Sequence, residues 1–233
     1  MSITNTILLL EPILITATIL ELVLNSKLYS LPSERFLIFE GRLTKADDTA
    51  YANADEVALT NNGIMHHFSR IEYHLSNQLI ESLNYPGQAT TMLGLLKYPD
   101  DFSKAHGLNQ LWYKDTVTTA AKADNNGFAA RHAYHIQSPT VKGAFSFRIL
   151  LKYSFGFCED YDKIAYGLKH SLTLVKKSDD DAIFRAAAAG AGKISIDKIS
   201  SFMPHVIPAD AEKFSIYKTI ESKVKLPVAY RTR

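Results

Sequence analysis

Residues 155–177, FGFCEDYDKIAYGLKHSLTLVKK, combine side chains that could bind a metal ion or catalyse a reaction. Three acids lie beside the only cysteine, and a histidine occupies the hydrophobic run that follows: Glu159, Asp160, Asp162, Cys158 and His170. A calcium loop needs oxygen ligands at alternating positions, a central glycine and a distal glutamate. The stretch EDYDKIAYG lacks that spacing. We therefore expect these acids to form the solvated turn of a β-hairpin.

The eight histidines do not predict a metal site. Adjacent side chains point to opposite faces of a strand, which would separate His66 from His67. His132 and His135 are three residues apart, and this odd spacing would also place them on opposite faces of a strand. The chain has no His-x-His pair of the kind that binds metal in cupins, so a cupin-type enzyme is disfavoured. We expect His170, alone on an apolar face, to be a hydrogen-bonded core residue.

Phosphate-binding and hydrolase motifs are incomplete. The stretch AAAAGAGKIS ends with the Gly192-Lys193 pair of a P-loop, but Ala187 occupies the position of the first glycine. Ile194 replaces the serine or threonine that would hold magnesium. The chain also lacks Gly-x-Ser-x-Gly, the motif of a common hydrolase class. We predict no catalytic residue, no cofactor, no metal and no enzymatic activity.

The neighbouring aromatic residues Trp112 and Tyr113 could stack on a sugar or a base. With nearby loop acids they would fit a lectin-like β-sandwich, which is the alternative function. We favour a core or interface position for them. The formal net charge of +2, from 26 basic and 24 acidic residues, lacks the basic excess of a nucleic-acid surface. We therefore expect no specific nucleic-acid partner.

Composition predicts a folded protein with a substantial core, since 46% of the 233 residues are hydrophobic and 11% are aromatic. A single cysteine excludes an internal disulfide and fits a reducing compartment, so we expect an intracellular location in cytoplasm or nucleus. Residues 7–24 have the length of a membrane span, but Glu11, Pro12 and Glu21 interrupt them. Each carboxylate would cost about 2.5–3.5 kcal/mol in a bilayer. We expect no membrane association, and buried strands or a packed helix instead.

Alternating apolar residues predict β-strands through most of the remaining chain. The predicted strands are RFLIFEGRL (35–43), IMHHFSRIEYHLS (64–76, with Phe68 out of phase), AYHIQS (133–138), AFSFRILLKYSF (144–155), GLKHSLTLV (167–175) and KISIDKIS (193–200). SNQ is expected to turn the second of these strands into LIES, and PTVKG to join 133–138 to 144–155 in a hairpin. Many short strands separated by turn signals indicate an all-β sandwich or barrel.

Helical signals are fewer. Residues 89–105 predict one or two short turns broken at Pro99. Residues 208–223 predict a helix, because Pro208 precedes acids in the first turn. Its apolar residues recur at spacing three: Phe214, Tyr217 and Ile220. AAAAGAG (186–192) is expected to be a flexible loop.

Several stretches, in this order, resemble the first half of the double jelly-roll major capsid proteins of large DNA viruses, most closely those of Polinton or adintovirus type. IEYHLSNQLIESLNYPG (71–87) resembles a strand pair of that family, followed by the short helical stretch TTMLGLLKYPDD. FSFRILLKYSFGF and IAYGLKHSLTLV resemble two paired strands, which the acidic segment would connect. KISIDKISSFMPHVIPADAEKFSIYKTIESK (193–223) resembles a last strand, a proline corner and a bridging helix. The resemblance covers residues 28–233.

The resemblance implies a jelly-roll domain over 28–207, with eight antiparallel strands in two sheets and short helices. Residues 1–27 are atypical for the family, and 208–233 correspond to the bridging helix and the start of a second roll. Because that second roll is missing, we expect a truncated, genome-integrated, transposon-derived structural protein. Its expected partners are copies of itself or homologous capsid subunits, in trimeric capsomers, and its location a virion if it assembles. An uncovered apolar flank should cause association.

Overall fold

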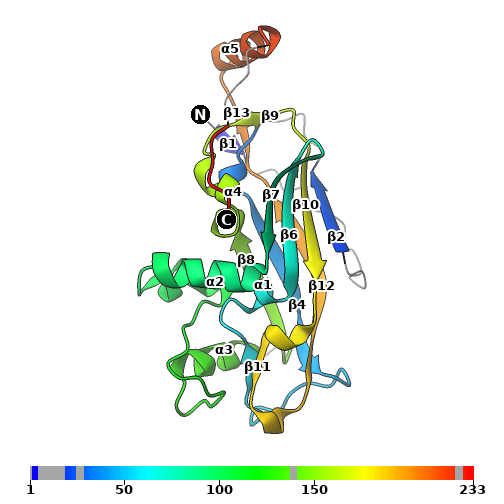
Figure 1. Ribbon diagram of the computed structural model, residues 1–233, viewed down its shortest axis with the longest axis vertical. Coiled ribbons are helices and arrows are strands. Elements are labelled where there is room, and N and C mark those ends of the chain that lie inside the picture. The colour runs from blue at the N-terminus through cyan, green and yellow to red at the C-terminus, as the bar shows by residue number, and fades with distance from the viewer. Residues whose placement is uncertain (1, 5–18, 25–28, 137–140, 224–227) are drawn as a thin grey trace.

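The hydrophobic core lies between two antiparallel sheets that pack face to face (Figure 1). The computed structural model describes residues 2–4, 19–24, 29–136, 141–223 and 228–233. The larger sheet has the order β2 (Ile19–Leu24), β10 (His170–Lys176), β6 (Phe68–Leu75) and β7 (Gln78–Asn84). The facing sheet has the order β12 (Gly192–Phe202), β4 (Phe36–Lys45) and β8 (Ala144–Leu150).

Smaller sheets extend this sandwich at its ends. One has the order β1 (Ser2–Thr4), β13 (His205–Ile207), β3 (Tyr29–Ser30) and β9 (Ala165–Tyr166), and another pairs β5 (Val57–Leu59) with β11 (Ile183–Arg185). Every strand pair among the described residues is antiparallel. The predicted all-β jelly-roll class is confirmed, although the described strands divide among four sheets and not two.

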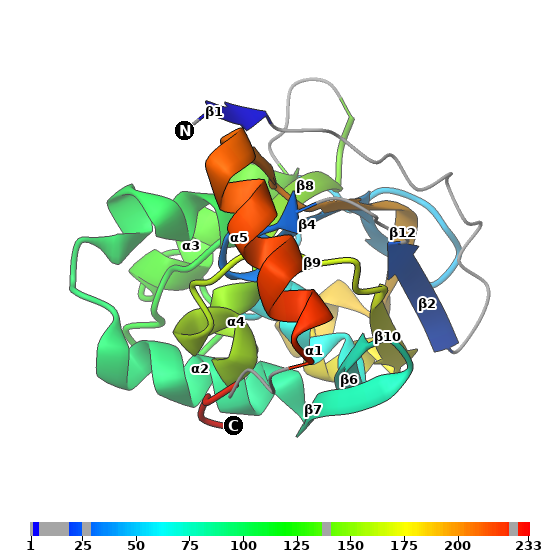
Figure 2. The ribbon, with the colours of Figure 1, turned by 90° about the horizontal axis from the view of Figure 1, so that it is seen from above.

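Helices cover one side and one end of the strands. They are α1 (Gly63–His66), α2 (Pro86–Lys97), α3 (Asn126–Ile136), α4 (Gly156–Asp160) and α5 (Asp210–Glu221). Seen from above, α2 and α3 lie on the side of the sandwich opposite β2, and α5 crosses over its end (Figure 2). Within the described part of the chain, no helix is long and apolar enough to cross a membrane.

Alternating side chains fill the space between the two main sheets. Leu37 and Phe39 of β4 face Ile71 of β6 and Leu172 of β10, and all four are at most 2% exposed. The cavity that remains between them has a volume of only about 10 Å³. Such tight packing is what a protein core requires to be rigid.

A β-bulge explains why Phe68 is out of phase with the rest of its strand. Arg70 pairs with Val175 and Phe68 pairs with Lys176, so Ser69 has no partner in the ladder. The extra residue returns Phe68 to the buried face shared with Ile71. At the other end of β6, Ser76 and Asn77 both have positive φ, 47° and 69°, as a tight hairpin turn requires. The predicted SNQ turn is confirmed.

The predicted strand 133–138 is wrong. Residues 133–136 belong to helix α3, and 137–138 lie outside the described residues. The predicted hairpin with 144–155 is therefore also wrong, because β8 pairs with β4. The buried face of α3 includes three polar residues, which hid its helical period in the sequence: Arg131, His132 and His135.

The predicted pairing across the acidic segment is wrong as well. Strand β8 ends at Leu150, the chain forms a 3₁₀ turn over Leu151–Tyr153, and β10 pairs with β2 and β6. The acids therefore do not form a hairpin turn. Residues 64–66, expected at the start of a strand, lie in α1. Helix α2 is longer than the predicted turns but ends before Pro99 as expected. The predicted helix 208–223 is confirmed by α5.

The described residues of the N-terminal region, 2–4 and 19–24, contribute strands β1 and β2 to the sheets. Strand β1 pairs with β13, and β2 pairs with β10 along its whole length. Leu20, Leu22 and Leu24 alternate toward the core, which agrees with the expected buried strand in this region. The rest of the predicted apolar segment, 7–18, lies outside the described residues.

Candidate functional site

Glu159 and Asp160, the first two acids after Cys158, contact the segment Val228–Arg233, which lies beside helix α4 (Figure 1). Asp160 accepts three hydrogen bonds from Arg231: from Nε at 2.9 Å, from Nη2 at 2.6 Å and from the backbone N–H at 2.8 Å. These bonds hold the pKa of the Asp160 carboxyl well below its usual range. Glu159 pairs with Arg233 and Lys97, whereas Asp162 is exposed.

Glu81, which sequence reasoning missed, completes this acidic cluster. It is 3% exposed and lies on β7. Its carboxylate accepts the backbone N–H groups of Gly156 at 3.1 Å and Phe157 at 2.9 Å, at the start of α4. It also accepts the N–H of Arg233 at 2.8 Å. Its one signal in the sequence is its spacing of two from Leu83, which places both side chains on the same face of the strand.

Cys158 lies in the core of the protein and not on this acidic surface. It is fully buried, and burial raises the pKa of its thiol to about 12. The thiolate is the form that attacks electrophiles and binds metals, so this cysteine is inert at neutral pH.

His170 is the hydrogen-bonded core residue that was predicted. Its Nδ1 lies 2.9 Å from the Tyr73 hydroxyl and its Nε2 lies 3.0 Å from the Ser30 hydroxyl. Burial, with smaller contributions from Arg35 and His205, lowers its pKa to about 3. His170 is therefore neutral and links strands β10, β6 and β3.

The expectation that the paired histidines point apart on strands is wrong, because neither pair lies on a strand. His66 ends α1, and His67 follows it with Nδ1 3.1 Å from an Asp179 carboxylate oxygen. His132 and His135 lie on α3, where a spacing of three places residues on the same side. Across the described ranges, no group of three or more His, Cys, Asp or Glu side chains could hold a metal ion.

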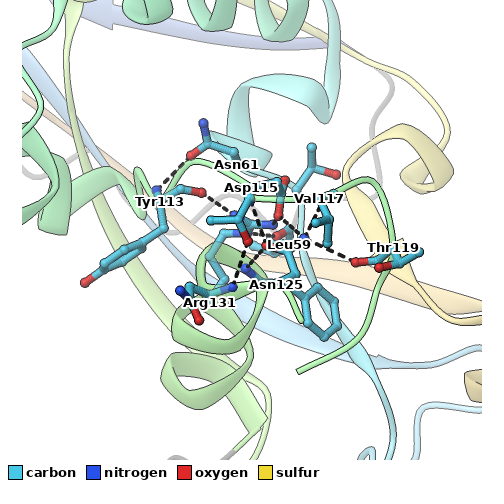
Figure 3. Close-up of polar contacts among 12 residues, drawn as sticks. Leu59, Asn61, Tyr113, Asp115, Val117, Thr119, Asn125 and Arg131 are labelled. Atoms are coloured by element: carbon cyan, nitrogen blue, oxygen red, sulfur yellow. Dashed lines mark hydrogen bonds and ion pairs between the residues drawn. The ribbon is translucent and has the colours of Figure 1, made fainter. Parts of the chain in front are cut away.

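Arg131 and Asn125 hold the loop before α3 in place (Figure 3). The buried Arg131 guanidinium donates to the Leu59 carbonyl at 2.8 Å, to the Tyr113 carbonyl, and to the Asp115 carboxylate at 2.6 Å. Asn125 donates to the same carboxylate at 2.8 Å and caps α3 by accepting the Phe128 N–H at 3.1 Å.

The Asn125 amide also donates to the carbonyls of Val117 at 3.0 Å and Thr119 at 3.2 Å, and Asn61 accepts the Tyr113 N–H at 2.8 Å (Figure 3). Each of the side-chain nitrogens that Arg131 and Asn125 contribute to this network donates to an atom of the protein itself. It therefore fixes the path of the loop.

Trp112 is a core residue, as was favoured. It is 1% exposed and packs edge-on against Tyr98, with ring centroids 5.0 Å apart. A Cβ on Gly94 would lie 2.3 Å from the Trp112 ring, so α2 covers this ring closely. Tyr113 is half-buried. A ring buried in this way does not offer a face to a sugar.

The stretch AAAAGAGKIS does not form a phosphate-binding loop. Lys193 lies in β12 and pairs with Asp48 at 2.8 Å. A P-loop would instead lead from a strand into the N-terminus of a helix.

Helices α5 and α2 each expose three or more apolar side chains. On α5, Phe214, Tyr217 and Ile220 are 74%, 47% and 50% exposed, and no residue of the helix is buried. A groove of about 420 Å³ is lined by residues of α5 and of the segment 161–168. On α2, the exposed apolar residues are Met92, Leu95 and Leu96.

Comparisons with solved structures found viral capsid proteins. The chain is similar to PBCV-1 VP54, fitted into a reconstruction of the virophage Sputnik, at 9% identity and a TM-score of 0.49, covering 84% of this chain and 40% of that one. It is similar to a subunit of the PBCV-1 virus capsid at 11% identity and a TM-score of 0.46, with the same coverages. It is also similar to the mavirus major capsid protein at 11% identity and a TM-score of 0.46, covering 91% and 47%.

The chain thus spans less than half the length of these structures. No curated protein matches it. Residues 57–233, from the start of β5 through α5 to the segment beside α4, match the sequence model of the double jelly roll-like domain. That match covers well over half of the chain, and the chain therefore belongs to the double jelly roll-like domain family.

Proposed function

We propose that this chain is a structural, non-enzymatic protein of the viral capsid type. The observation that carries the proposal is the family match over residues 57–233. A coat subunit needs a rigid sandwich and surfaces that fit its neighbours. The close-packed core between the sheets meets the first need. The exposed apolar residues of α2 and α5 offer candidates for the second.

The origin and partners of the chain are finer parts of the same proposal. The sequence resemblance to Polinton and adintovirus capsid proteins supports a virus- or transposon-derived origin. Its partners would be further copies or homologous capsid subunits, in trimeric capsomers. Its location would be a virion, or the cytoplasm or nucleus before assembly. The division into a roll over 28–207 and a bridging region over 208–233, and the expected truncation, stay predictions.

Sedimentation velocity over a range of concentrations tests whether the α5 stripe drives association. Replacing Phe214 and Ile220 together by serine should shift the protein toward the monomer, because both side chains are at least half exposed in the single chain. Lys218→Ser, at an exposed position of the same helix, is the matched control and should leave association unchanged. Concentration-independent monomer for the unmodified chain would contradict the proposal.

Carbohydrate binding is not favoured by the geometry, because Trp112 is buried beneath α2. Calorimetric titration with a panel of oligosaccharides should show no saturable binding. Saturable binding that is lost in Tyr113→Ala would favour the lectin-like alternative.

A further inference from the structure

The carboxylate of Glu81 is oriented by the body of the protein, independently of the segment Val228–Arg233. Its Oε2 accepts the Phe157 N–H at 2.9 Å and its Oε1 accepts the Gly156 N–H at 3.1 Å. Oε1 also accepts the Arg233 N–H at 2.8 Å. A buried carboxylate held by two backbone donors is pre-organised, so little conformational entropy is lost when the third donor binds.

Three residues of the segment contact the body of the protein through their side chains. The Tyr230 hydroxyl donates to the Ile80 carbonyl at 2.8 Å, and its ring lies edge-on to Phe157 with centroids 5.3 Å apart. The Arg231 guanidinium donates to both carboxylate oxygens of Asp160 in a bidentate contact. The Arg233 guanidinium pairs with Glu159 and is only 12% exposed. Charge-assisted, bidentate contacts of this kind are strong and directional.

The backbone of the segment approaches α4 so closely that a side chain at Gly156 is excluded. A Cβ there would lie 1.8 Å from the Arg231 carbonyl oxygen. The surface is therefore shaped to the backbone of the segment as well as to its charges.

We propose that Glu81, Glu159 and Asp160 form a peptide-recognition site for a Tyr-Arg-x-Arg sequence, and that residues 230–233 of the same chain are its ligand. The inference does not depend on the proposed capsid role. Docking of the segment also affects the surroundings of α5, a helix with no buried residue. Val228, which precedes the docked residues, lines the apolar groove beside that helix. Docking of the segment sets one wall of the groove.

A nitroxide spin label on Thr232→Cys tests the docking in the full chain, since Thr232 is exposed whereas Cys158 is buried and unreactive. Asp160→Arg and Arg231→Asp should each increase the mobility of the label several-fold, and the two together should restore slow motion. Asp210→Arg, which disrupts only the Lys213 pair on α5, is the control and should change nothing. Equal mobility in all variants, or no restoration by the charge swap, would overturn the proposal.

A second arm tests recognition without covalent linkage. In the full chain with Arg231→Ala and Arg233→Ala, the site is intact but its own ligand is weakened. The peptide acetyl-Val-Ala-Tyr-Arg-Thr-Arg-amide should bind this chain saturably and should lose binding when Asp160→Arg is added. Absence of saturable binding would overturn recognition of the sequence. If the mobility of the spin label increased on dilution, the segment would be bound by a second copy and not by its own chain, because only binding between chains depends on concentration. Circular dichroism verifies that each variant is folded.

Discussion

The His170 imidazole and the Tyr73 hydroxyl lie 2.9 Å apart in the core, where both side chains are fully buried. Replacing Tyr73 by phenylalanine removes the hydroxyl and leaves a buried imidazole nitrogen without its partner. We expect a loss of about 1–3 kcal/mol in the free energy of unfolding, measured with urea. Tyr134→Phe, at a tyrosine that is 43% exposed, is the control and should change little. Equal effects of the two substitutions would contradict a role for the hydrogen bond.

Burial of neutral histidines predicts that acid destabilises the protein. Desolvation lowers the pKa of His170 and of His135 from 6.5 to about 3. Between those values the unfolded chain binds more protons than the folded one, so stability falls as the pH falls below about 6.5. Each histidine contributes a slope of about 1.4 kcal/mol per pH unit within that window.

Urea unfolding at pH 7.5 and at pH 5 measures this slope. Asp160 and the other carboxyls with lowered pKa contribute only below their ordinary value of 3.8, so they do not interfere at pH 5. His135→Leu should reduce the difference between the two pH values. A free energy of unfolding that is the same at both would contradict the account.

Gly41 on β4 is required by close contact with the neighbouring strand. A Cβ there would lie 2.1 Å from the Ser195 carbonyl oxygen and 2.8 Å from the Phe145 ring, beside the bulge at Asp197. Gly41→Ala should therefore lower the free energy of unfolding by about 1–3 kcal/mol, since the strands must move apart. Ser146→Ala, at an exposed position of β8, should have almost no effect in the same urea titration.

Arg131 should not tolerate lysine. A single ammonium group cannot reach the Leu59 carbonyl, the Tyr113 carbonyl and Asp115 together, because it lacks the planar fork of the guanidinium. Buried acceptors that lose their donor cost about 1–3 kcal/mol each, so thermal and urea unfolding should both show a clear loss. Arg70→Lys, in a half-exposed pair with Glu72, is the control and should cost about 0–1 kcal/mol. A negligible effect at Arg131 would contradict the network.

Local alternation predicted most of the strands that build the sandwich. Leu37 and Phe39, Ile71 and Tyr73, and Ile194 alternate with exposed or half-exposed neighbours, as a strand with one buried face requires. The turn at Ser76 and Asn77 was also predictable, since asparagine tolerates positive φ. These features depend on residues close together in the chain.

Helix α3 could not be predicted in this way. Its buried face carries Arg131 and His135, whose polarity hides the helical period, and they are stabilised by contacts with distant residues. The predicted strand pairing was also wrong, because the true partners are far apart in the sequence. Strand β8 pairs with β4, more than a hundred residues earlier, and not with β10, which follows it.

The acidic segment shows most clearly that local sequence does not predict contacts between distant parts of the chain. Nothing near Asp160 in the sequence indicates Arg231, which is 71 positions away. Glu159 and Asp160 lie in the short helix α4 and contact another part of the chain, so they do not form the expected solvated turn. The only signal for Glu81 in the sequence is weak: an acid occupies a position on the same strand face as Leu83.

The proposed capsid-type role requires this chain to associate with other subunits. Size-exclusion chromatography with light scattering at micromolar concentration tests it most directly. We expect a mass well above the 26.0 kDa of one chain, or a broad distribution of larger species. A single sharp peak at the mass of one chain would contradict it.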